Sequence, residues 1–251
     1  MLIDLHAHTS GISKCCQIAA PNMLRVAREN GMDGVVLCNH YQKSYVTDGD
    51  FDAFARRYVA EYEYTRAEGE AIGVRVLFGI EVTTDWIPEG KDCSVHLLIY
   101  GVDTDFVLQH PRMFEYTQEE LYRTVHEAGG ILVQAHPWRR KDRLIDTRYL
   151  DGIEISCHPL YEGTYLAPLA EIAAREGLIL TCGGDFHNDT HRPTCGVYLP
   201  NGVENTRMLA AYLAGADTVT LAVQEVDERC PHTVIFQRGV GIVTDGCKGE
   251  Q

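Results

Sequence analysis

The sequence predicts an α/β fold, a single barrel-like domain of about seven strands that helices cover. Three observations support this prediction. The chain has 251 residues, a length that α/β barrels use for one domain. Short, nearly continuous apolar runs alternate with longer segments of helical period, which is typical of repeated β/α units. The sequence shows no linker or low-complexity segment between them, so we expect one domain.

Four strands and two helices are predicted in the first half of the chain. The strands are expected at apolar runs, typical of strands buried on both faces, at 2–5, 34–38, 74–82 and 94–100. A helix is expected at 21–30, because Pro21 suits its first turn and Gly31 ends it. The second helix is expected at 50–68, an amphipathic segment rich in Tyr and Arg.

The second half of the chain repeats this alternation. The expected strands are 131–135, 152–157 and 178–182, and the expected helices are 117–128 and 166–176. The pattern is less regular after Gly202, where 203–213 can form a last helix and 219–223 and 234–243 can add strands. From Asp245 onward the chain is polar, and we expect a frayed end.

Composition and charge narrow the classes of function. Hydrophobic residues make up 45% and charged residues 23% of the chain, as in globular proteins, which excludes a disordered chain. With 22 basic and 36 acidic residues the net charge is −14, so the chain has no overall attraction for a nucleic-acid backbone or an anionic membrane. A phosphorylated substrate would need a local source of positive charge, which metal ions supply.

The nine cysteines are scattered along the chain and form no CxxC pair. We therefore expect reduced thiols in a cytoplasmic protein. No signal peptide precedes the first predicted strand, and no apolar run approaches the ~20 residues that span a bilayer, so no membrane partner is expected.

Histidine and acidic residues gather at the ends of the predicted strands. They are His6, His8, His40, Glu81, His96, His136, Glu154, Asp185 and His187. Because barrel enzymes build their active sites where the strands end, we expect these side chains to converge. Residues two apart on a strand point to the same side, so His6 and His8 can share an ion. Nitrogen and carboxylate ligands together suit zinc, iron or manganese, and the set predicts a site for several metal ions.

Each of these residues taken alone is a weak signal. A lone His-x-His motif is more often structural or on the surface, and His96 by itself could be a core histidine. We interpret Glu154 as a buried residue that supports the fold or the ligands. The remaining histidines are interpreted as surface or packing residues, namely His110, His126, His191 and His232. The aromatic residues between 41 and 64 are interpreted as packing, and the loop 41–50 could act as a lid.

The ordered motifs, which begin with Asp4-Leu5-His6-Ala7-His8-Thr9, resemble the polymerase and histidinol phosphatase family, the PHP domain. The resemblance covers about residues 1–200. It implies a distorted, seven-stranded, TIM-like β/α barrel over those residues, with 201–251 completing the same domain. It also implies a phosphoesterase whose rim binds two or three divalent ions, which we expect to be zinc, iron or manganese.

The resemblance also implies a distribution of ligands over the ions. One ion would bind His6, His8, Glu81 and Asp185; a second would share Glu81 and add His96 and His136; a third would bind His40 and His187. Relatives usually complete the third site with an acidic residue or a histidine, but this chain has Ser13-Lys14-Cys15-Cys16 there. Cys15 could supply a thiolate to zinc or iron. Alternatively the third site is weak or empty and Lys14 replaces part of its charge, which we favour slightly.

A second departure concerns Asn39, which stands where the family often has Asp. That Asp usually orients a ligand, so the substitution puts an orienting hydrogen bond in doubt, while the ligand His40 is retained.

The predicted activity is metal-dependent hydrolysis of a phosphoester, most simply a small phosphomonoester. Metal-activated hydroxide would attack without a covalent enzyme intermediate, and Glu81 and Asp185 would hold the catalytic ions. Arg139 could bind the phosphate with its guanidinium, and His158 could contact the substrate or protonate the leaving group. Arg140, Lys141 and Arg143 share that loop, so a solvated arginine is the alternative for Arg139, although we favour the phosphate role slightly. For His158 a plain loop histidine is the interpretation that we favour. Lys14 is a third candidate for substrate binding.

Two alternatives to a phosphatase remain open. A nuclease or nucleotide phosphodiesterase would require a basic groove, against which the acidic composition argues mildly. A metal-binding domain without catalysis would keep the ligands and have a structural or regulatory role. Neither the oligomeric state nor the substrate follows from the sequence.

Overall fold

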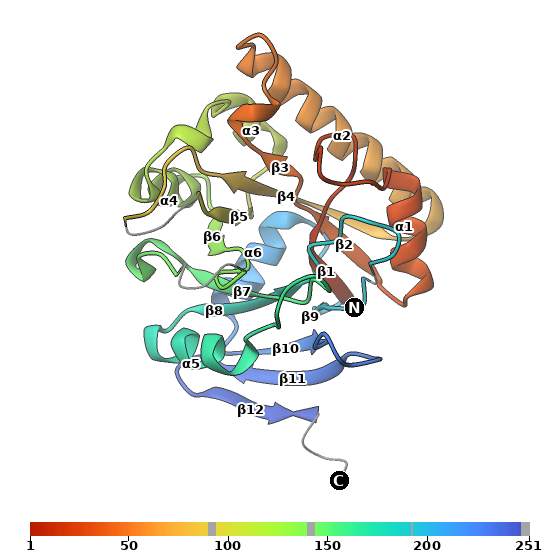
Figure 1. Cartoon of the computed structure of the whole chain (residues 1–251), viewed down its shortest axis with the longest axis vertical. Helices are drawn as coiled ribbons and strands as arrows, with labels where there is room; N and C mark the ends of the chain where they lie inside the picture. Colours follow the sequence, from red (N-terminus) through yellow and green to blue (C-terminus); the bar gives the residue numbers. More distant parts are fainter. Residues whose placement is uncertain (90–93, 140–143, 192, 247–251) are drawn as a thin grey trace.

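Twelve strands form one strongly curled sheet in the computed structural model, which describes residues 1–89, 94–139, 144–191 and 193–246 (Figure 1). The strands are β1 (Leu2–Ala7), β2 (Gly34–Leu37), β3 (His40–Tyr41), β4 (Arg75–Thr83), β5 (His96–Tyr100), β6 (Ile131–Gln134), β7 (Gly152–Ser156), β8 (Ile179–Gly183), β9 (Gly196–Tyr198), β10 (Thr218–Val223), β11 (His232–Gln237) and β12 (Gly241–Asp245). Their order is β12-β11-β10-β9-β1-β2-β4-β5-β6-β7-β8, and β3 pairs with β4 off this path. Arg140, Lys141 and Arg143 lie outside the described residues.

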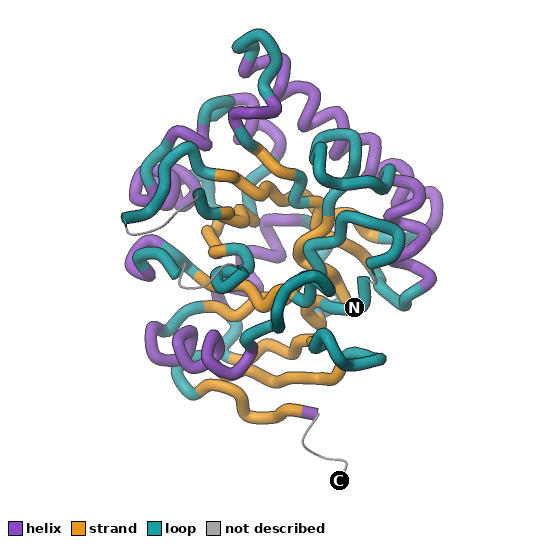
Figure 2. Tube along the Cα trace, viewed as in Figure 1, coloured by secondary structure: helices purple, strands orange, loops and turns teal. Residues whose placement is uncertain are grey.

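Helices cover the upper part and the sides of the sheet, and β10 to β12 form its lower end (Figures 1 and 2). They are α1 (Ala20–Glu29), α2 (Phe51–Ile72), α3 (Thr104–Gln109), α4 (Gln118–Glu127), α5 (Leu166–Glu176) and α6 (Thr206–Gly215). Short 3-10 helices lie at Lys43–Tyr45, Met113–Glu115 and Thr147–Tyr149. The five long helices were predicted, whereas the short α3 was not. No helix in the described part of the chain has the length and apolar character to cross a membrane.

Local sequence explains where the long helices begin and end. The Asp50 carboxylate accepts a hydrogen bond from the Ala53 N–H and so caps α2, which ends at Gly73 with φ 74°. Thr117 and Glu120 form a capping box at the start of α4. These caps satisfy backbone groups that the helix itself leaves unpaired.

The strand β1 is the centre of the sheet, because it pairs with β2 on one edge and β9 on the other. The pairing with β9 uses only Leu2 and Ile3, which leaves the same edge free at Ala7. There an isolated bridge joins Ala7 to Phe186, just after β8. The result is a single-domain α/β fold with a half-barrel sheet. The sheet thus has more strands than the predicted seven, because β9 to β12 extend it past β1.

The alternation of strand and helix fails between β4 and β6. β5 pairs antiparallel with both β4 and β6, so the chain reverses its direction between β4 and β5. The first residue of β5, His96, therefore lies beside Thr83 at the end of β4. The reversal brings His96 to the same rim as residues at the carboxyl ends of parallel strands.

The C-terminal strands continue the sheet in an antiparallel meander in the lower part of Figure 1. The predicted run 234–243 is divided into β11 and β12 by a turn at Gly239, where φ is 73°. Buried residues of β10 and β11, such as Leu221 and Phe236, belong to the same hydrophobic core as Leu5 and Ile80. The strands β10 and β11 thus share a core with β1 and β4.

Candidate metal centre

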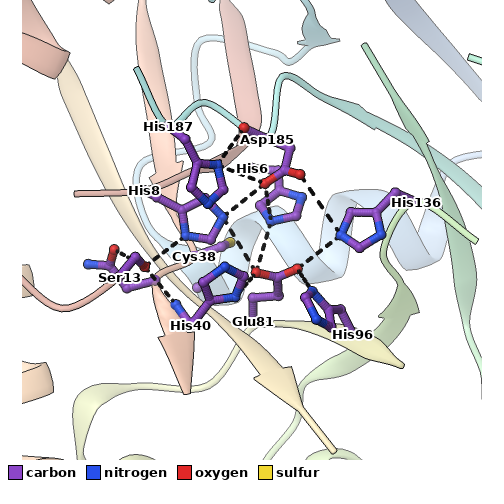
Figure 3. Close-up of polar contacts among 12 residues, drawn as sticks. His6, His8, Ser13, Cys38, His40, Glu81, His96, His136, Asp185 and His187 are labelled. Carbon is purple, nitrogen blue, oxygen red and sulfur yellow. Dashed lines mark hydrogen bonds and ion pairs between the residues drawn. The ribbon is translucent and has the colours of Figure 1, made fainter. Parts of the chain in front are cut away.

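The eight predicted ligands lie together at one rim of the sheet (Figure 3). His6 and His8 flank Ala7 at the end of β1. The Nε2 atom of each points to Glu81 Oε2, at 3.5 and 3.4 Å, and to Asp185 Oδ1, at 3.6 and 3.1 Å. His6 and His8 thus point to the same side of β1, as expected for residues two apart on a strand.

Glu81 is buried at the centre of this cluster. Its Oε1 lies 2.7 Å from His96 Nδ1 and 3.1 Å from His136 Nε2. Its Oε2 faces the other histidines, including His40 Nδ1 at 2.5 Å. One carboxylate thus divides the surrounding imidazoles into two sets.

Two site residues have backbone conformations that non-glycine residues rarely adopt. His136 has φ 28° and Asp185 has φ 48°. Pro137 follows His136 and disfavours a helical conformation there. Before Asp185, Gly183 allows β8 to approach β1, because a Cβ at Gly183 would lie 2.6 Å from the Cβ of His6.

A chain of hydrogen bonds fixes the proton of His8. The Thr9 N–H donates to Asn39 Oδ1 (2.8 Å), so this oxygen is an acceptor. Ser13 Oγ donates its only proton to the same oxygen (2.9 Å) and therefore accepts from the His40 N–H and from His8 Nδ1, both at 3.0 Å. Asn39, which stands where the family often has Asp, thus orients His8 through Ser13.

His8 consequently carries its hydrogen on Nδ1 and presents a lone pair at Nε2. Burial, followed by the neighbouring His187 and His40, lowers the pKa of His8 well below its usual value, so His8 is neutral. Its Nε2 faces Asp185 Oδ1 at 3.1 Å. Two acceptors that face each other in a buried place are stabilised by a cation between them.

Glu154 orients His6 in the same way. Its carboxylate accepts from His6 Nδ1 (2.9 Å) and from the His136 N–H (3.0 Å), so His6 Nε2 is directed at Glu81. The interpretation of Glu154 as a buried supporting residue agrees with these contacts.

The two central carboxylates remain ionised. Burial alone would raise the pKa of Glu81, but His40, His96 and His6 outweigh it and hold that pKa well below the usual range. The pKa of Asp185 is lowered in the same way, chiefly by His6. In return, the carboxylates overcome the effect of burial and raise the pKa of His40 to about 9 and that of His187 to about 10.

Several of these atoms fit a metal ion better than they fit one another. Within the described residues, His6 Nε2, His40 Nδ1 and Glu81 Oε2 are buried and have no hydrogen-bond partner. His40 Nδ1 and Glu81 Oε2 approach each other without hydrogen-bond geometry. Unpaired buried nitrogen and carboxylate atoms are costly unless an ion binds them. The donor set suits divalent ions of the zinc, iron and manganese type.

A cavity of about 630 Å³ opens beside the cluster. Its lining includes the predicted residues Cys15, His40, His96, Arg139, His158, Asp185 and His187. Burial would raise the pKa of Cys15, but hydrogen bonds with His187 and His40 lower it to about 6. Lys14 is not in this lining; its Nζ donates to the Ser44 carbonyl oxygen (3.2 Å) and lies over the Tyr45 ring.

Sequence reasoning missed three residues of the site. Ser13 is a buried link to His8, and Tyr161 donates its hydroxyl hydrogen to Asp185 Oδ2. His191, interpreted as surface or packing, is buried and lines the cavity. Of these three, only His191 could have been identified from the sequence, since it lies four positions after the predicted ligand His187. The other three histidines interpreted as surface or packing pair away from the site, as expected: His110 with Tyr116, His126 with Asp151 and His232 with Glu228.

This α/β half-barrel gathers buried imidazoles and carboxylates at one rim, where they form several groups of three that could hold a divalent metal ion. The chain matches no family model. It also matches no curated protein sequence. Solved structures of similar fold include the following three.

The first is a proposed metal-dependent phosphoesterase from Bifidobacterium adolescentis, with 19% identity and a TM-score of 0.54, over 86% of this chain and 96% of that one. The second is a two-domain protein with a predicted PHP-like metal-dependent phosphoesterase from Bacteroides vulgatus, with 12% identity and a TM-score of 0.62, over 98% and 88%. The third is a lesion-specific endonuclease from Pyrococcus furiosus, with 13% identity and a TM-score of 0.55, over 86% of this chain and 56% of the endonuclease. At these identities the similarity establishes a shared fold, and at that level the resemblance to the PHP family is confirmed.

Proposed function

We propose that this protein is a metal-dependent hydrolase of phosphoesters and that its substrate is a small phosphomonoester. The observation that carries the proposal is the position of Glu81, whose two oxygens face different sets of histidines. A carboxylate so placed suits a bridge between two ions about 3.5–4 Å apart, as in two-metal phosphatases and nucleases. The fold that the chain shares with metal-dependent phosphoesterases supports the same activity.

The contacts around Glu81 support the distribution of ligands expected from the family. His6, His8, Glu81 Oε2 and Asp185 Oδ1 would hold one ion. Glu81 Oε1, His96 and His136 would hold a second. His40 and His187, which group with His8, would hold a third.

Cys15 is the candidate that completes the third site. It lines the same cavity as His40 and His187, and with its pKa lowered to about 6 it is a thiolate at neutral pH. Lys14 instead points to Ser44. This arrangement favours Cys15 over Lys14. In Cys15→Ser we therefore expect the loss of one equivalent of bound zinc, and an unchanged zinc content would exclude Cys15 as a ligand.

Divalent ions held by these histidines, Glu81 and Asp185 would supply positive charge for the phosphoryl oxygens and would lower the pKa of water, which suits hydrolysis without a covalent enzyme intermediate. Arg139 lines the cavity and can donate two hydrogen bonds to a phosphate. His158 accepts from the Leu160 N–H at Nδ1 (3.1 Å), and burial lowers its pKa to about 4. It is therefore neutral at pH 7 with its hydrogen on Nε2, and can donate that hydrogen bond to the leaving-group oxygen.

The cavity favours a small substrate. Its volume of about 630 Å³ is in the range of small-molecule sites. The net charge of −14 disfavours a long polyanion outside the metal centre. A larger cavity of about 710 Å³, between Met1, Arg66 and Asn205, has no histidine or cysteine in its described lining and offers no comparable chemistry.

A second candidate is a nuclease or nucleotide phosphodiesterase, because one protein of the same fold is a lesion-specific endonuclease. The experiment that separates the candidates is phosphate release by metal-reconstituted protein from phosphomonoesters, nucleotides and short oligonucleotides. Release from small monoesters that a chelator abolishes would support the phosphatase. Cleavage of oligonucleotides alone would support the nuclease, and bound metal without any release would favour a non-catalytic metal-binding domain.

His6→Ala tests the site itself, with His126→Ala as a matched histidine that pairs with Asp151 and packs against Tyr122 away from the site. We expect His6→Ala to lose metal and turnover together and His126→Ala to keep both. Unchanged turnover in His6→Ala would exclude this site as the active site.

We also propose that residues 1–200 form the distorted barrel, with β1, β2 and β4 to β8 as its seven strands, and that 201–251 extend it. A cytoplasmic location is proposed as well, and the described cysteines, all free thiols, support it.

A further inference from the structure

Tyr161 lies in the segment between β7 and α5 and lines the cavity beside the metal centre. Its N–H donates to the His158 carbonyl oxygen (3.1 Å), a turn that folds its ring onto the His158 imidazole. The two rings stack, with centroids 4.4 Å apart and planes inclined by 18°. The guanidinium carbon of Arg139 lies 5.3 Å from the centroid of the Tyr161 ring.

The hydroxyl group of Tyr161 donates to Asp185 Oδ2. The other oxygen, Oδ1, faces His8 Nε2 at 3.1 Å and His6 Nε2 at 3.6 Å, whereas Oδ2 has His136 Nε2 at the longer distance of 4.0 Å. The two oxygens of this carboxylate are therefore not equivalent. A charge-assisted hydrogen bond at Oδ2 opposes rotation of the carboxylate and keeps Oδ1 directed at the ligand cluster.

The ring of Tyr161 acts on a different group. An arginine within about 6 Å of an aromatic centroid is attracted by the ring, and more strongly where water is excluded. The backbone of Arg139 lies in the turn after His136, and its N–H donates to the His136 carbonyl oxygen (3.0 Å). Contact with the Tyr161 ring limits the positions that its long side chain can occupy over the cavity.

We propose that Tyr161 is a positioning residue with two separable parts: its hydroxyl selects the Asp185 oxygen that faces the metal ions, and its ring holds Arg139 where a phosphate binds. The inference rests on the proposed function, since it assigns partners to the metal ions and to the phosphate. In this role Tyr161 contacts neither the metal ions nor the phosphate. Tyr161 thereby links Asp185, a proposed metal ligand, to Arg139, the cationic side chain that lines the cavity. This link fixes the position of the phosphate relative to the metal ions.

Tyr161→Phe isolates the hydroxyl, and Tyr165→Phe is its matched control, because the Tyr165 hydroxyl only meets the exposed Glu162 (3.1 Å). The metal-free variants are titrated with Co²⁺, and the visible spectrum of the bound ion is recorded. We expect Tyr161→Phe to bind Co²⁺ about 10- to 100-fold more weakly, with a changed spectrum. Tyr165→Phe should match the wild type in both respects.

Tyr161→Leu removes the ring as well, and inorganic phosphate at saturating Co²⁺ is the second probe. We expect phosphate affinity to fall by a further factor of about 2–30 relative to Tyr161→Phe. Arg139→Gln should lower phosphate affinity in the wild type and in Tyr161→Phe. Its effect should be much smaller in Tyr161→Leu, because that variant already lacks the ring that positions Arg139.

Each part of the inference can be overturned separately. Unchanged Co²⁺ affinity and spectrum in Tyr161→Phe would overturn the role of the hydroxyl even if Tyr161→Leu failed to fold. Equal effects of Arg139→Gln in the Phe and Leu variants would overturn the role of the ring. A wild-type protein that binds no Co²⁺, Zn²⁺ or Mn²⁺ would instead overturn the proposed function, which is a different result from equal binding by wild type and variant.

Discussion

Side chains that are not ligands themselves set the direction of the imidazoles in this protein. Glu154 and Ser13 each occupy the Nδ1 side of a histidine, so that His6 and His8 both direct Nε2 into the centre. The imidazole tautomer is thus decided by the hydrogen-bonding partner away from the ion. Neither partner resembles a metal ligand in its sequence position, and each can be tested by a single substitution.

Glu154→Gln keeps the volume of the side chain but removes its charge and one acceptor. The His6 Nδ1 and His136 N–H bonds then compete for a single oxygen. We expect metal affinity to fall about 10- to 100-fold, measured by titration of the metal-free protein. Glu176→Gln, which alters an exposed carboxylate of α5, should leave metal affinity unchanged. Equal affinities in the two variants would contradict the role assigned to Glu154.

Ser13→Ala removes the link between Asn39 and His8. The His8 Nδ1 hydrogen and the His40 N–H then lose their buried acceptor. Unsatisfied buried groups cost about 1–3 kcal/mol each, so the free energy of unfolding should fall by that amount or more in urea titration. Ser44→Ala, which removes an exposed acceptor of Gln42, should change stability by less than about 0.5 kcal/mol.

At the scale of the elements, the close approach of β8 to β1 brings Asp185 to the histidines of β1. The strands meet through the bridge from Ala7 to Phe186, and hydrogen bonds from His8 N–H and Phe186 N–H complete it. Asp4 adds an acceptor for the Gly184 N–H (2.9 Å). The absence of a side chain at Gly183 makes this distance possible.

Gly183→Ala should therefore push the two strands apart. The new Cβ would lie 2.6 Å from the Cβ of His6 and 2.8 Å from Glu154 Oε1. Overpacking of this kind costs about 1–3 kcal/mol, and we expect metal affinity to fall with stability. Gly202→Ala, where a Cβ meets nothing within 4 Å, is the control for the loss of glycine. If Gly183→Ala binds metal as tightly as the control, the position of β8 does not limit the site.

On the scale of the whole molecule, the metal centre concentrates ionisable groups inside a chain of net charge −14. Without ions, His40 and His187 are charged and stabilise the central carboxylates, which stabilise them in return. With ions bound, the same histidines must be neutral, so binding releases protons. Stability and metal affinity should therefore respond to pH in opposite directions.

The metal-free protein should lose stability as the pH rises from 7 to 10. His40 and His187 have pKa values of about 9 and about 10, above the ordinary value of 6.5, so their contribution is complete below pH 6.5 and disappears as the pH passes 9 to 10. Cys15, with its pKa lowered to about 6, offsets this only in part. We expect the free energy of unfolding in EDTA to fall by at least about 2 kcal/mol, whereas metal affinity rises over the same range. Stability in EDTA that does not change with pH would contradict this coupling.

Much of the secondary structure and the inventory of ligands could be predicted, for identifiable reasons. The strands that became β1, β2, β4 and β6 to β8 are apolar runs, and such runs are buried in any α/β fold. The direction of β5 was not predicted, because the period of a strand is the same in both directions. β3 and β9 have two and three residues, too few to show a pattern.

The identities of the eight candidate ligands were in the sequence because imidazoles and carboxylates at strand ends are a local pattern. Their roles were not, because each depends on a contact between distant segments: His6 with Glu154, 148 positions away, and Ser13 with Asn39, 26 positions away. Tyr161 became part of the site only because its turn folds toward Asp185. Local periodicity decides which residues form a strand and which reach its end. Register, strand direction and loop packing decide which atoms face each other, and these are properties of the folded chain alone.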